Sequence, residues 1–110
     1  MPEWVDVCSI DDLQENSGVC CLVEGKQIAL FYLKHETEQT VFALNNYDPI
    51  GKANVLSRGI IGSLSGEPVV ASPLYKEHYS LKTGQCLEDE SVAVDVFAVR
   101  LNNHRVEIQA

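Results

Sequence analysis

Histidine, cysteine and carboxylate side chains are the groups of this chain that could act as catalysts or metal ligands. The three histidines stand far apart, each in a polar turn or at a strand edge, at His35, His78 and His104. An imidazole can serve as a general base or a metal ligand, but these contexts favour solvated surface histidines. The sequence also contains no Gly-x-Ser-x-Gly, glycine-rich phosphate loop or His-Glu-x-x-His pattern. We therefore expect no catalytic residue in this chain.

Neither the cysteines nor the acidic residues at 88–90 indicate a metal-binding or catalytic pair. No Cys-x-x-Cys pair is present among the four cysteines, Cys8, Cys20, Cys21 and Cys86. The amino terminus lacks the basic and apolar regions of a secretory signal, so a cytoplasmic location and free thiols that act as small hydrophobes are expected. The acidic run at 88–90 is interpreted as a solvated turn or as a surface that docks a basic partner.

Length and charge restrict the class of protein. A chain of 110 residues has the size of one domain, expected to span 1–110. The formal charge of −8, from 16 acidic and 8 basic residues, argues against binding to nucleic acid or to an anionic membrane. No apolar run approaches the roughly 18 residues of a membrane span. A protein partner with a basic patch remains compatible with this charge.

Period-two alternation, interrupted by closely spaced turn residues, predicts an all-β fold built from antiparallel hairpins. Residues 11–18 are expected to form a polar turn, and residues 45–58 an ordered loop. Hairpin turns are expected at 24–26, 65–67, 82–84 and 102–104, where Gly25, for example, accepts positive φ without strain. The predicted strands are 4–10, 19–23, 27–33, 40–44, 60–64, 68–71, 78–81, 85–87, 92–101 and 105–108.

Two loops carry the most specific pattern. The first contains Asp48-Pro49-Ile50, and the second contains Ser72-Pro73-Leu74-Tyr75, followed by the run Tyr79 to Gly84 that ends in Thr-Gly. Over residues 40–84 this order and spacing resembles the Rieske iron–sulfur domain, whose loops carry Cys-x-His and Cys-Pro-x-His. The resemblance implies a Rieske-like stack of antiparallel β-sheets.

The same resemblance shows that the cluster ligands are missing. Position by position, the first cysteine and histidine of the family fall on Asp48 and Ile50, and the second pair falls on Ser72 and Tyr75. A Rieske [2Fe–2S] cluster needs two thiolates on one iron and two imidazoles on the other. Ile50 cannot ligate, and Asp48 and Tyr75 belong to different halves of the site. No cofactor and no metal are therefore expected on this chain.

A second resemblance covers nearly the whole chain. The sequence resembles the small subunit of the cytoplasmic NAD(P)H-dependent nitrite reductase, beginning with its Trp4-Val5-Asp6 opening. The motifs that carry this resemblance are Asn46-Tyr47-Asp48-Pro49, Leu56-Ser57-Arg58-Gly59, Ser72-Pro73-Leu74 and Gly84-Gln85-Cys86-Leu87-Glu88-Asp89.

This resemblance implies a partner and a reaction. The partner would be a large catalytic subunit that binds FAD and NAD(P)H and carries sirohaem with a [4Fe–4S] cluster. It would reduce nitrite to ammonium in nitrate assimilation or nitrite detoxification. The present chain would be part of an enzyme without being catalytic alone, and it would support assembly, stability or modulation of the large subunit. The alternative is a free-standing degenerate Rieske-fold module that binds a small ligand or another redox partner.

Two accounts describe what the loops do without a cluster. In the first, Ile50 and Tyr75 fill the vacated volume, while Asp48 and Ser72 hydrogen-bond to backbone amides. In the second, the loop tips are an exposed docking surface on which Arg58, Tyr75 and Lys76 anchor the partner. A pairing of Arg58 with Asp48, which would merely order the loop, is the competing explanation for that arginine. The sequence leaves these accounts open.

Overall fold

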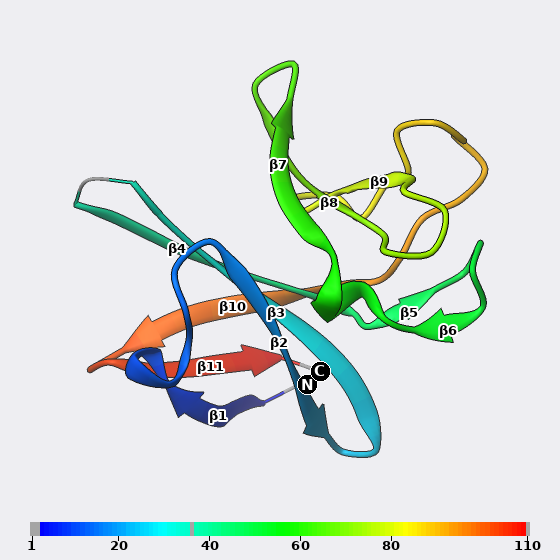
Figure 1. Ribbon diagram of the computed structural model, residues 1–110. Helices are drawn as coiled ribbons and strands as arrows, with labels where there is room; N and C mark the ends of the chain where they lie inside the picture. Colours follow the sequence, from blue (N-terminus) through cyan, green and yellow to red (C-terminus); the bar gives the residue numbers. More distant parts are fainter. Residues whose placement is uncertain (1–2, 36, 110) are drawn as a thin grey trace.

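The computed structural model describes residues 3–35 and 37–109, and it is built almost entirely from strands (Figure 1). The all-β prediction is confirmed. The elements are β1 (Trp4–Ser9), η1 (Ile10–Asp12), β2 (Ser17–Val23), β3 (Lys26–His35), β4 (Glu38–Asn45), β5 (Tyr47–Asp48), β6 (Ala53–Asn54), η2 (Leu56–Arg58), β7 (Ile60–Leu64), β8 (Glu67–Ala71), β9 (His78–Ser80), β10 (Val96–Asn102) and β11 (Arg105–Gln109), where η denotes a 3-10 helix.

The strands form one large sheet, one small sheet and a two-stranded ribbon. The large sheet has six strands in the order β1-β11-β10-β4-β3-β2, and the small sheet has three in the order β7-β8-β9. All pairings are antiparallel among the residues that the structure describes. In Figure 1 the small sheet and the β5–β6 ribbon both lie beyond the same side of the large sheet. This arrangement brings the two loops of interest together.

Short-range turn chemistry explains the hairpins that form as predicted. The β2–β3 turn has positive φ at Glu24 (51°) and Gly25 (81°), the combination required by a type I′ turn. The β7–β8 and β10–β11 hairpins also form where expected. These three hairpins supply six of the strands that make up the two sheets.

The predicted hairpin around 82–84 is wrong in its second strand. Only an isolated bridge between Tyr79 and Cys86 joins the two sides, and β10 begins at Val96, later than expected. The side chain of Gln85 explains the difference, because its Nε2 donates to the carbonyl oxygens of Glu90 (3.0 Å) and Val92 (2.9 Å). This amide takes the place of the ladder bonds that a regular strand would make, so the segment closes as a loop.

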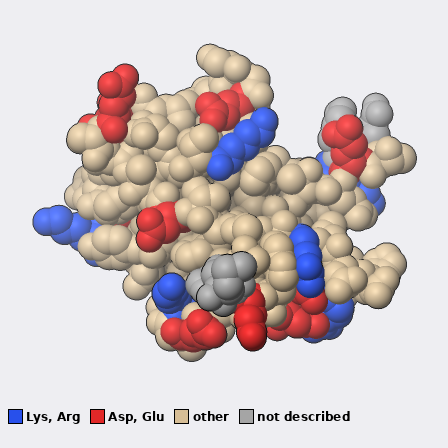
Figure 2. Space-filling view, turned by 180° about the vertical axis from the view of Figure 1, so that it is seen from behind, with Lys and Arg blue, Asp and Glu red and all other residues tan. Residues whose placement is uncertain are grey.

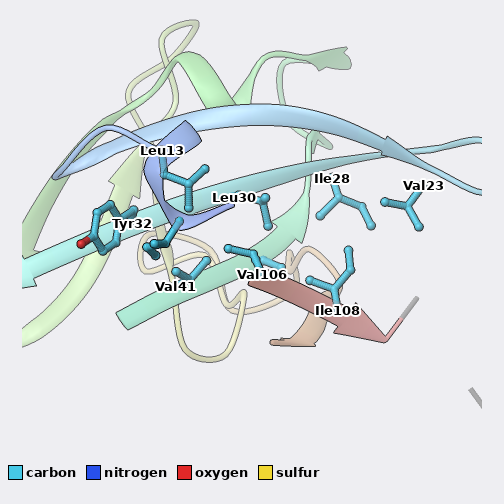
Figure 3. Packing of buried hydrophobic residues seen from close by; sticks show 10 residues of the cluster. Leu13, Val23, Ile28, Leu30, Tyr32, Val41, Val106 and Ile108 are labelled. Carbon is cyan, nitrogen blue, oxygen red and sulfur yellow. The ribbon is translucent and has the colours of Figure 1, made fainter. Parts of the chain in front are cut away.

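Two clusters of buried side chains form the core. The first lies inside the curved large sheet, where side chains from β2, β3, β4 and β11 point toward one another (Figure 3). The second lies between the large and small sheets and contains Phe31, Leu56, Val70 and Tyr79. Tyr79 therefore belongs to the core and, at the same time, to the end of the molecule where the two loops meet.

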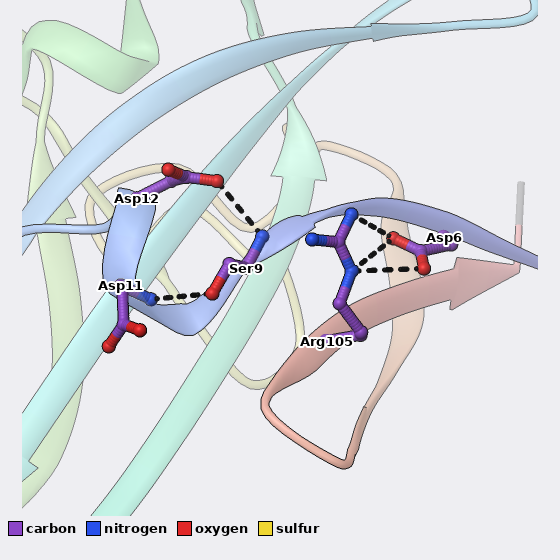
Figure 4. Close-up of polar contacts among 5 residues, drawn as sticks. All are labelled: Asp6, Ser9, Asp11, Asp12 and Arg105. Carbon is purple, nitrogen blue, oxygen red and sulfur yellow. Dashed lines mark hydrogen bonds and ion pairs between the residues drawn. The ribbon is translucent and has the colours of Figure 1, made fainter.

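The start of the chain is fixed to its end. At η1 the Asp12 carboxylate accepts the Ser9 N–H and the Ser9 hydroxyl accepts the Asp11 N–H, as in a capping box, and Arg105 on β11 forms a bidentate ion pair with Asp6 on β1 (Figure 4). The capping box satisfies backbone N–H groups that a short helix would otherwise leave open. The Asp6–Arg105 ion pair joins the edge strand β1 to β11 in addition to their backbone pairing.

The surface has the mixed charge expected of an acidic globular protein. On the face seen from behind, acidic and basic side chains are interspersed among uncharged areas, and no continuous basic area covers that face (Figure 2). Among the described residues, no helix has the length and apolar character needed to cross a bilayer.

Candidate functional site

The candidate site lies where two loops pack against each other. The first loop (residues 45–59) contains the β5–β6 ribbon and η2, and the second loop (residues 72–77) connects β8 to β9. The loops touch at Gly51, where a Cβ atom would lie only 2.4 Å from Leu74 Cδ1. The contact leaves little room for a side chain at position 51, so the two loops are closely packed.

A direct hydrogen bond between buried side chains joins the loops. Ser72 Oγ donates to Asp48 Oδ2 at 2.5 Å, and neither residue exposes more than 1% of its surface. Each also caps its own loop, because the Ile50 N–H donates to Asp48 Oδ1 (2.9 Å) and the Leu74 N–H donates to Ser72 Oγ (3.3 Å). The predicted bonding of both side chains to backbone amides is confirmed, and their bond to each other goes beyond it.

Two further side chains complete this buried network. Tyr79 Oη donates to Asp48 Oδ1 at 2.8 Å and lies 3.4 Å from Glu77 Oε1. Glu77 is 7% exposed, and its Oε2 has no hydrogen-bond partner among the described residues. A buried carboxylate oxygen without a partner is costly, which favours the protonated form of Glu77.

The pKa values of the two buried carboxyl groups are shifted in opposite directions. Burial raises the pKa of Glu77, and the neighbouring Asp48 raises it further. Burial also acts to raise the pKa of Asp48, but the hydrogen bonds that its carboxylate accepts, among them those from Ser72 and Tyr79, outweigh burial and lower this pKa. Burial and the Asp48 charge raise the pKa of Tyr79, so its phenol remains a donor. These shifts favour the ionised form of Asp48 and the neutral form of Glu77.

Asn46 attaches the first loop to the large sheet. It is 2% exposed, its Nδ2 donates to Gln27 Oε1 (3.2 Å), and its Oδ1 accepts the Ser57 N–H (2.7 Å). Its backbone N–H and carbonyl bond to Gln27 and Leu56. One asparagine therefore connects β3, the ribbon and η2, and it fixes the loop before Asp48.

Comparison with known proteins identifies the frame that these loops belong to. A profile of the Rieske-like [2Fe-2S] domain matches residues 3–109. The nitrite reductase (NADH) small subunit of Salmonella typhimurium is 41% identical over 109 residues, which cover 99% of each chain. The chain belongs to the nitrite reductase small-subunit family.

Solved structures and a longer relative agree with this assignment. The NMR structure of the Escherichia coli protein NirD is 40% identical, covers 100% of this chain and 98% of that chain, and has a TM-score of 0.90. The nitrite reductase [NAD(P)H] large subunit of Klebsiella oxytoca is 37% identical over 103 residues, which make up 10% of that protein. In that relative, a segment like this family's small subunit is part of the large-subunit chain itself.

The residues of this small-subunit homologue do not fit the cluster that a Rieske-like domain implies. At the four positions given by the resemblance, Ile50 has no donor atom, and Asp48 and Ser72 are already bound to each other. The fourth position, Tyr75, is 71% exposed and turned away from them. Across 3–35 and 37–109, no group of three or more histidine, cysteine or acidic side chains is placed to hold a metal ion.

The prediction that Ile50 and Tyr75 fill the vacated volume is wrong. Ile50 is 36% exposed, and Tyr75 is more exposed still. The second loop closes through the Lys76 N–H to the Ser72 carbonyl (3.0 Å) and the Ser72 N–H to the Glu77 carbonyl (2.9 Å), which leaves Tyr75 at the tip of the turn. The polar side chains of Asp48 and Ser72 occupy the interior.

Sequence reasoning missed Glu77, Tyr79 and Asn46 as members of the site. Glu77 and Tyr79 are two positions apart on the way into β9, and residues at this spacing on a strand face the same side. An acid and a tyrosine with this spacing, directly after a loop that carries Ser72, could have indicated a buried polar pair. Asn46 stood in the Asn46-Tyr47-Asp48-Pro49 motif of the family resemblance, but that motif indicated no role for its side chain.

The predicted anchors Arg58, Tyr75 and Lys76 all lie exposed on the two loops. The pairing of Arg58 with Asp48 is wrong, because the Asp48 carboxylate accepts from Ser72, Tyr79 and a backbone amide instead. Within the described residues, neither Arg58 nor Lys76 takes part in an ion pair. Their role as anchors stays a prediction.

The other candidate groups have structural roles or lie apart. His78 Nδ1 lies 2.6 Å from Glu88 Oε2, and the His78 N–H donates to Glu88 Oε1 (2.7 Å). Glu88 is thus engaged with β9, whereas the run 88–90 was expected to be a solvated or docking turn. The four cysteines are free, and Cys86 is buried in the second core cluster. His104 is exposed in the last hairpin, and the His35 side chain lies outside the described residues.

Proposed function

We propose that this chain is the cluster-free small subunit of a cytoplasmic NAD(P)H-dependent nitrite reductase. Residues 1–110 act as one Rieske-like domain that binds a large catalytic subunit and supports its assembly, stability or activity. The large subunit carries FAD, sirohaem and a [4Fe–4S] cluster and reduces nitrite to ammonium in nitrate assimilation. The isolated chain has no catalytic activity.

The observation that carries this proposal is the hydrogen bond between Asp48 and Ser72. By the Rieske resemblance, this bond lies where two cluster thiolates would be. The chain that contains it is 41% identical to a nitrite reductase small subunit over 99% of its length. The cluster frame is therefore retained as a rigid loop platform without electron-carrying ligands. A platform that does not carry electrons favours a role in binding over a role in electron transfer.

The Klebsiella relative supports the choice of partner. Because its large-subunit chain includes a segment 37% identical to this one, small-subunit-like and large-subunit regions occur together in one polypeptide. Two regions that are covalently joined in one protein are good candidates to bind each other where they are separate chains. We assign the two loops, with Arg58, Tyr75 and Lys76, to the contact.

Co-expression of the affinity-tagged chain with the large subunit tests this function. We expect the two to co-purify in a fixed ratio, and we expect nitrite reduction by the large subunit to persist longer at elevated temperature when the small chain is present. A tagged chain that purifies alone and leaves the large subunit unchanged would contradict the proposal and favour the free-standing binding module.

A further inference from the structure

A groove that is open to solvent lies beside the second loop, and it borders the buried network at Ser72. It has a volume of about 500 Å³. Its lining residues are Arg58, Ile60, Ala71, Ser72, Pro73, Lys76 and His78, and together they are called the Ile60 groove below.

The small sheet shapes the floor of this groove. Ile60 on β7 pairs with Ala71 on β8, and Ala71 pairs with His78 on β9. Directly opposite residues in antiparallel strands face the same side, so the three side chains form one row. The methyl group of Ala71 is smaller than its two neighbours, and this difference leaves a depression between Ile60 and His78.

The groove combines an exposed apolar side chain with uncompensated positive charge. Ile60 is 78% exposed, the most exposed of the large hydrophobic residues described. Arg58 and Lys76 flank it without ion-pair partners in the described part of the chain, whereas His78 is held by Glu88. In a chain of formal charge −8, these two cations beside an apolar depression form a surface that suits a partner with an apolar side chain and negative charge.

We infer that the Ile60 groove receives a segment of the large subunit in which an apolar side chain is flanked by carboxylates. This inference rests on the proposed function and adds to it the position and the chemistry of the contact. The apolar side chain packs on Ile60 and Ala71, and the carboxylates pair with Arg58 and Lys76. Nucleic acid and anionic lipid do not fit this groove. The overall negative charge of the chain repels them, and two cations are too few to bind a polyanion.

Variants with reversed character at the groove test this inference against matched variants elsewhere. Ile60→Asp and Arg58→Glu are compared with Leu22→Asp on β2, where Leu22 is 72% exposed, and with Lys82→Glu, which is also exposed. Affinity for the large subunit is measured by surface-immobilised binding, and folding of each variant is checked by circular dichroism. We expect the groove variants to weaken binding at least about 30-fold, the size of an interface hot spot, and the controls to bind like the wild type.

Several outcomes would overturn the inference. If the wild-type chain binds the large subunit and the folded groove variants bind equally well, the contact lies elsewhere while the proposed function stands. If the wild-type chain does not bind at all, both fail. If the chain alone sediments as a dimer that Ile60→Asp dissociates, the groove binds a second copy and not the large subunit. If Ile60→Asp does not fold, Arg58→Glu alone decides, since it changes only an exposed charge.

Discussion

Ser72 Oγ lies 2.5 Å from Asp48 Oδ2, so the two side chains that the Rieske resemblance predicts at the cluster cysteine positions are hydrogen-bonded to each other. Removing the hydroxyl in Ser72→Ala leaves a buried carboxylate oxygen of Asp48 without that donor. An unsatisfied buried acceptor costs about 1–3 kcal/mol, and we expect Ser72→Ala to lower the free energy of unfolding by this amount in urea denaturation.

The matched control is Ser63→Ala on β7, where the serine is exposed. It should change the free energy of unfolding by less than about 0.5 kcal/mol. Equal stability of the two variants would show that the loops are closed by their backbone contacts alone and that the side-chain bond contributes nothing.

The opposite pKa shifts of Glu77 and Asp48 predict how stability depends on pH. Burial and Asp48 raise the pKa of Glu77 above its ordinary value of 4.5, so its stabilising contribution is complete below that value and is lost as pH rises through the folded pKa. The lowered pKa of Asp48 acts in the opposite sense, with a contribution present above 3.8 and lost as pH falls through the folded pKa.

Glu77→Gln isolates the first effect, because glutamine keeps the shape of a protonated glutamate and cannot ionise. At about pH 9 we expect this variant to be more stable than the wild type, because the difference grows by up to about 1.4 kcal/mol per pH unit between the ordinary pKa of 4.5 and the raised folded pKa of Glu77, and is constant above the folded pKa. Near pH 5 the two should be similar. Urea denaturation at several pH values measures this, with the exposed Glu90→Gln as control. A pH-independent difference would mean that Glu77 does not titrate in this range.

The missing ligands predict a chain without a cluster. After anaerobic expression, the purified protein should be colourless and iron-free, since Ile50 cannot ligate and Asp48 is held by Ser72 and Tyr79. A chelator should leave the thermal midpoint unchanged, because a structural metal would contribute folding free energy directly. A Rieske ferredoxin expressed in parallel serves as the positive control. Stoichiometric iron with acid-labile sulfide would restore an electron-transfer role.

The features predicted correctly from sequence depend on neighbours along the chain. The turns at Gly25 and Gly66 join strands that follow each other, so local turn chemistry suffices to predict them. The network at Asp48 joins residues 24 and 31 positions apart, and no local pattern encodes those distances. The family resemblance placed Asp48 and Ser72 together but could not indicate which atoms replace the cluster.

Tyr75 illustrates the same limit for the rim of the site. A large aromatic residue at a vacated ligand position was expected to fill volume. Its direction is set by the backbone of the second loop, where Lys76 has a φ of 62° and the turn closes from Ser72 to Glu77. Such a closure depends on the hydrogen bonds of the whole loop and not on the size of one side chain.

Gly84, the glycine of the Thr-Gly pair after β9, packs closely against the chain that enters β10. Its φ is +78°, and a Cβ atom there would lie 2.1 Å from the carbonyl oxygen of Val94. Its N–H donates to the Ser80 carbonyl (2.8 Å), and its own carbonyl accepts the Val94 N–H (2.9 Å). Gly84 therefore joins the segment that follows Tyr79 to the chain entering β10.

Gly84→Ala should destabilise the fold by at least about 2 kcal/mol, because it adds the cost of a left-handed backbone to a clash with backbone atoms that cannot rotate away. Gly62→Ala on β7 is the matched control, since nothing lies within 4 Å of its Cβ position. Alanine suits a strand better than glycine by roughly 0.5–1 kcal/mol, so this control should be neutral or slightly stabilising. Urea denaturation of both variants measures the difference. If Gly84→Ala proved as stable as Gly62→Ala, the loop after β9 would have to adjust freely, and its close contact with Val94 would not fix the position of Tyr79.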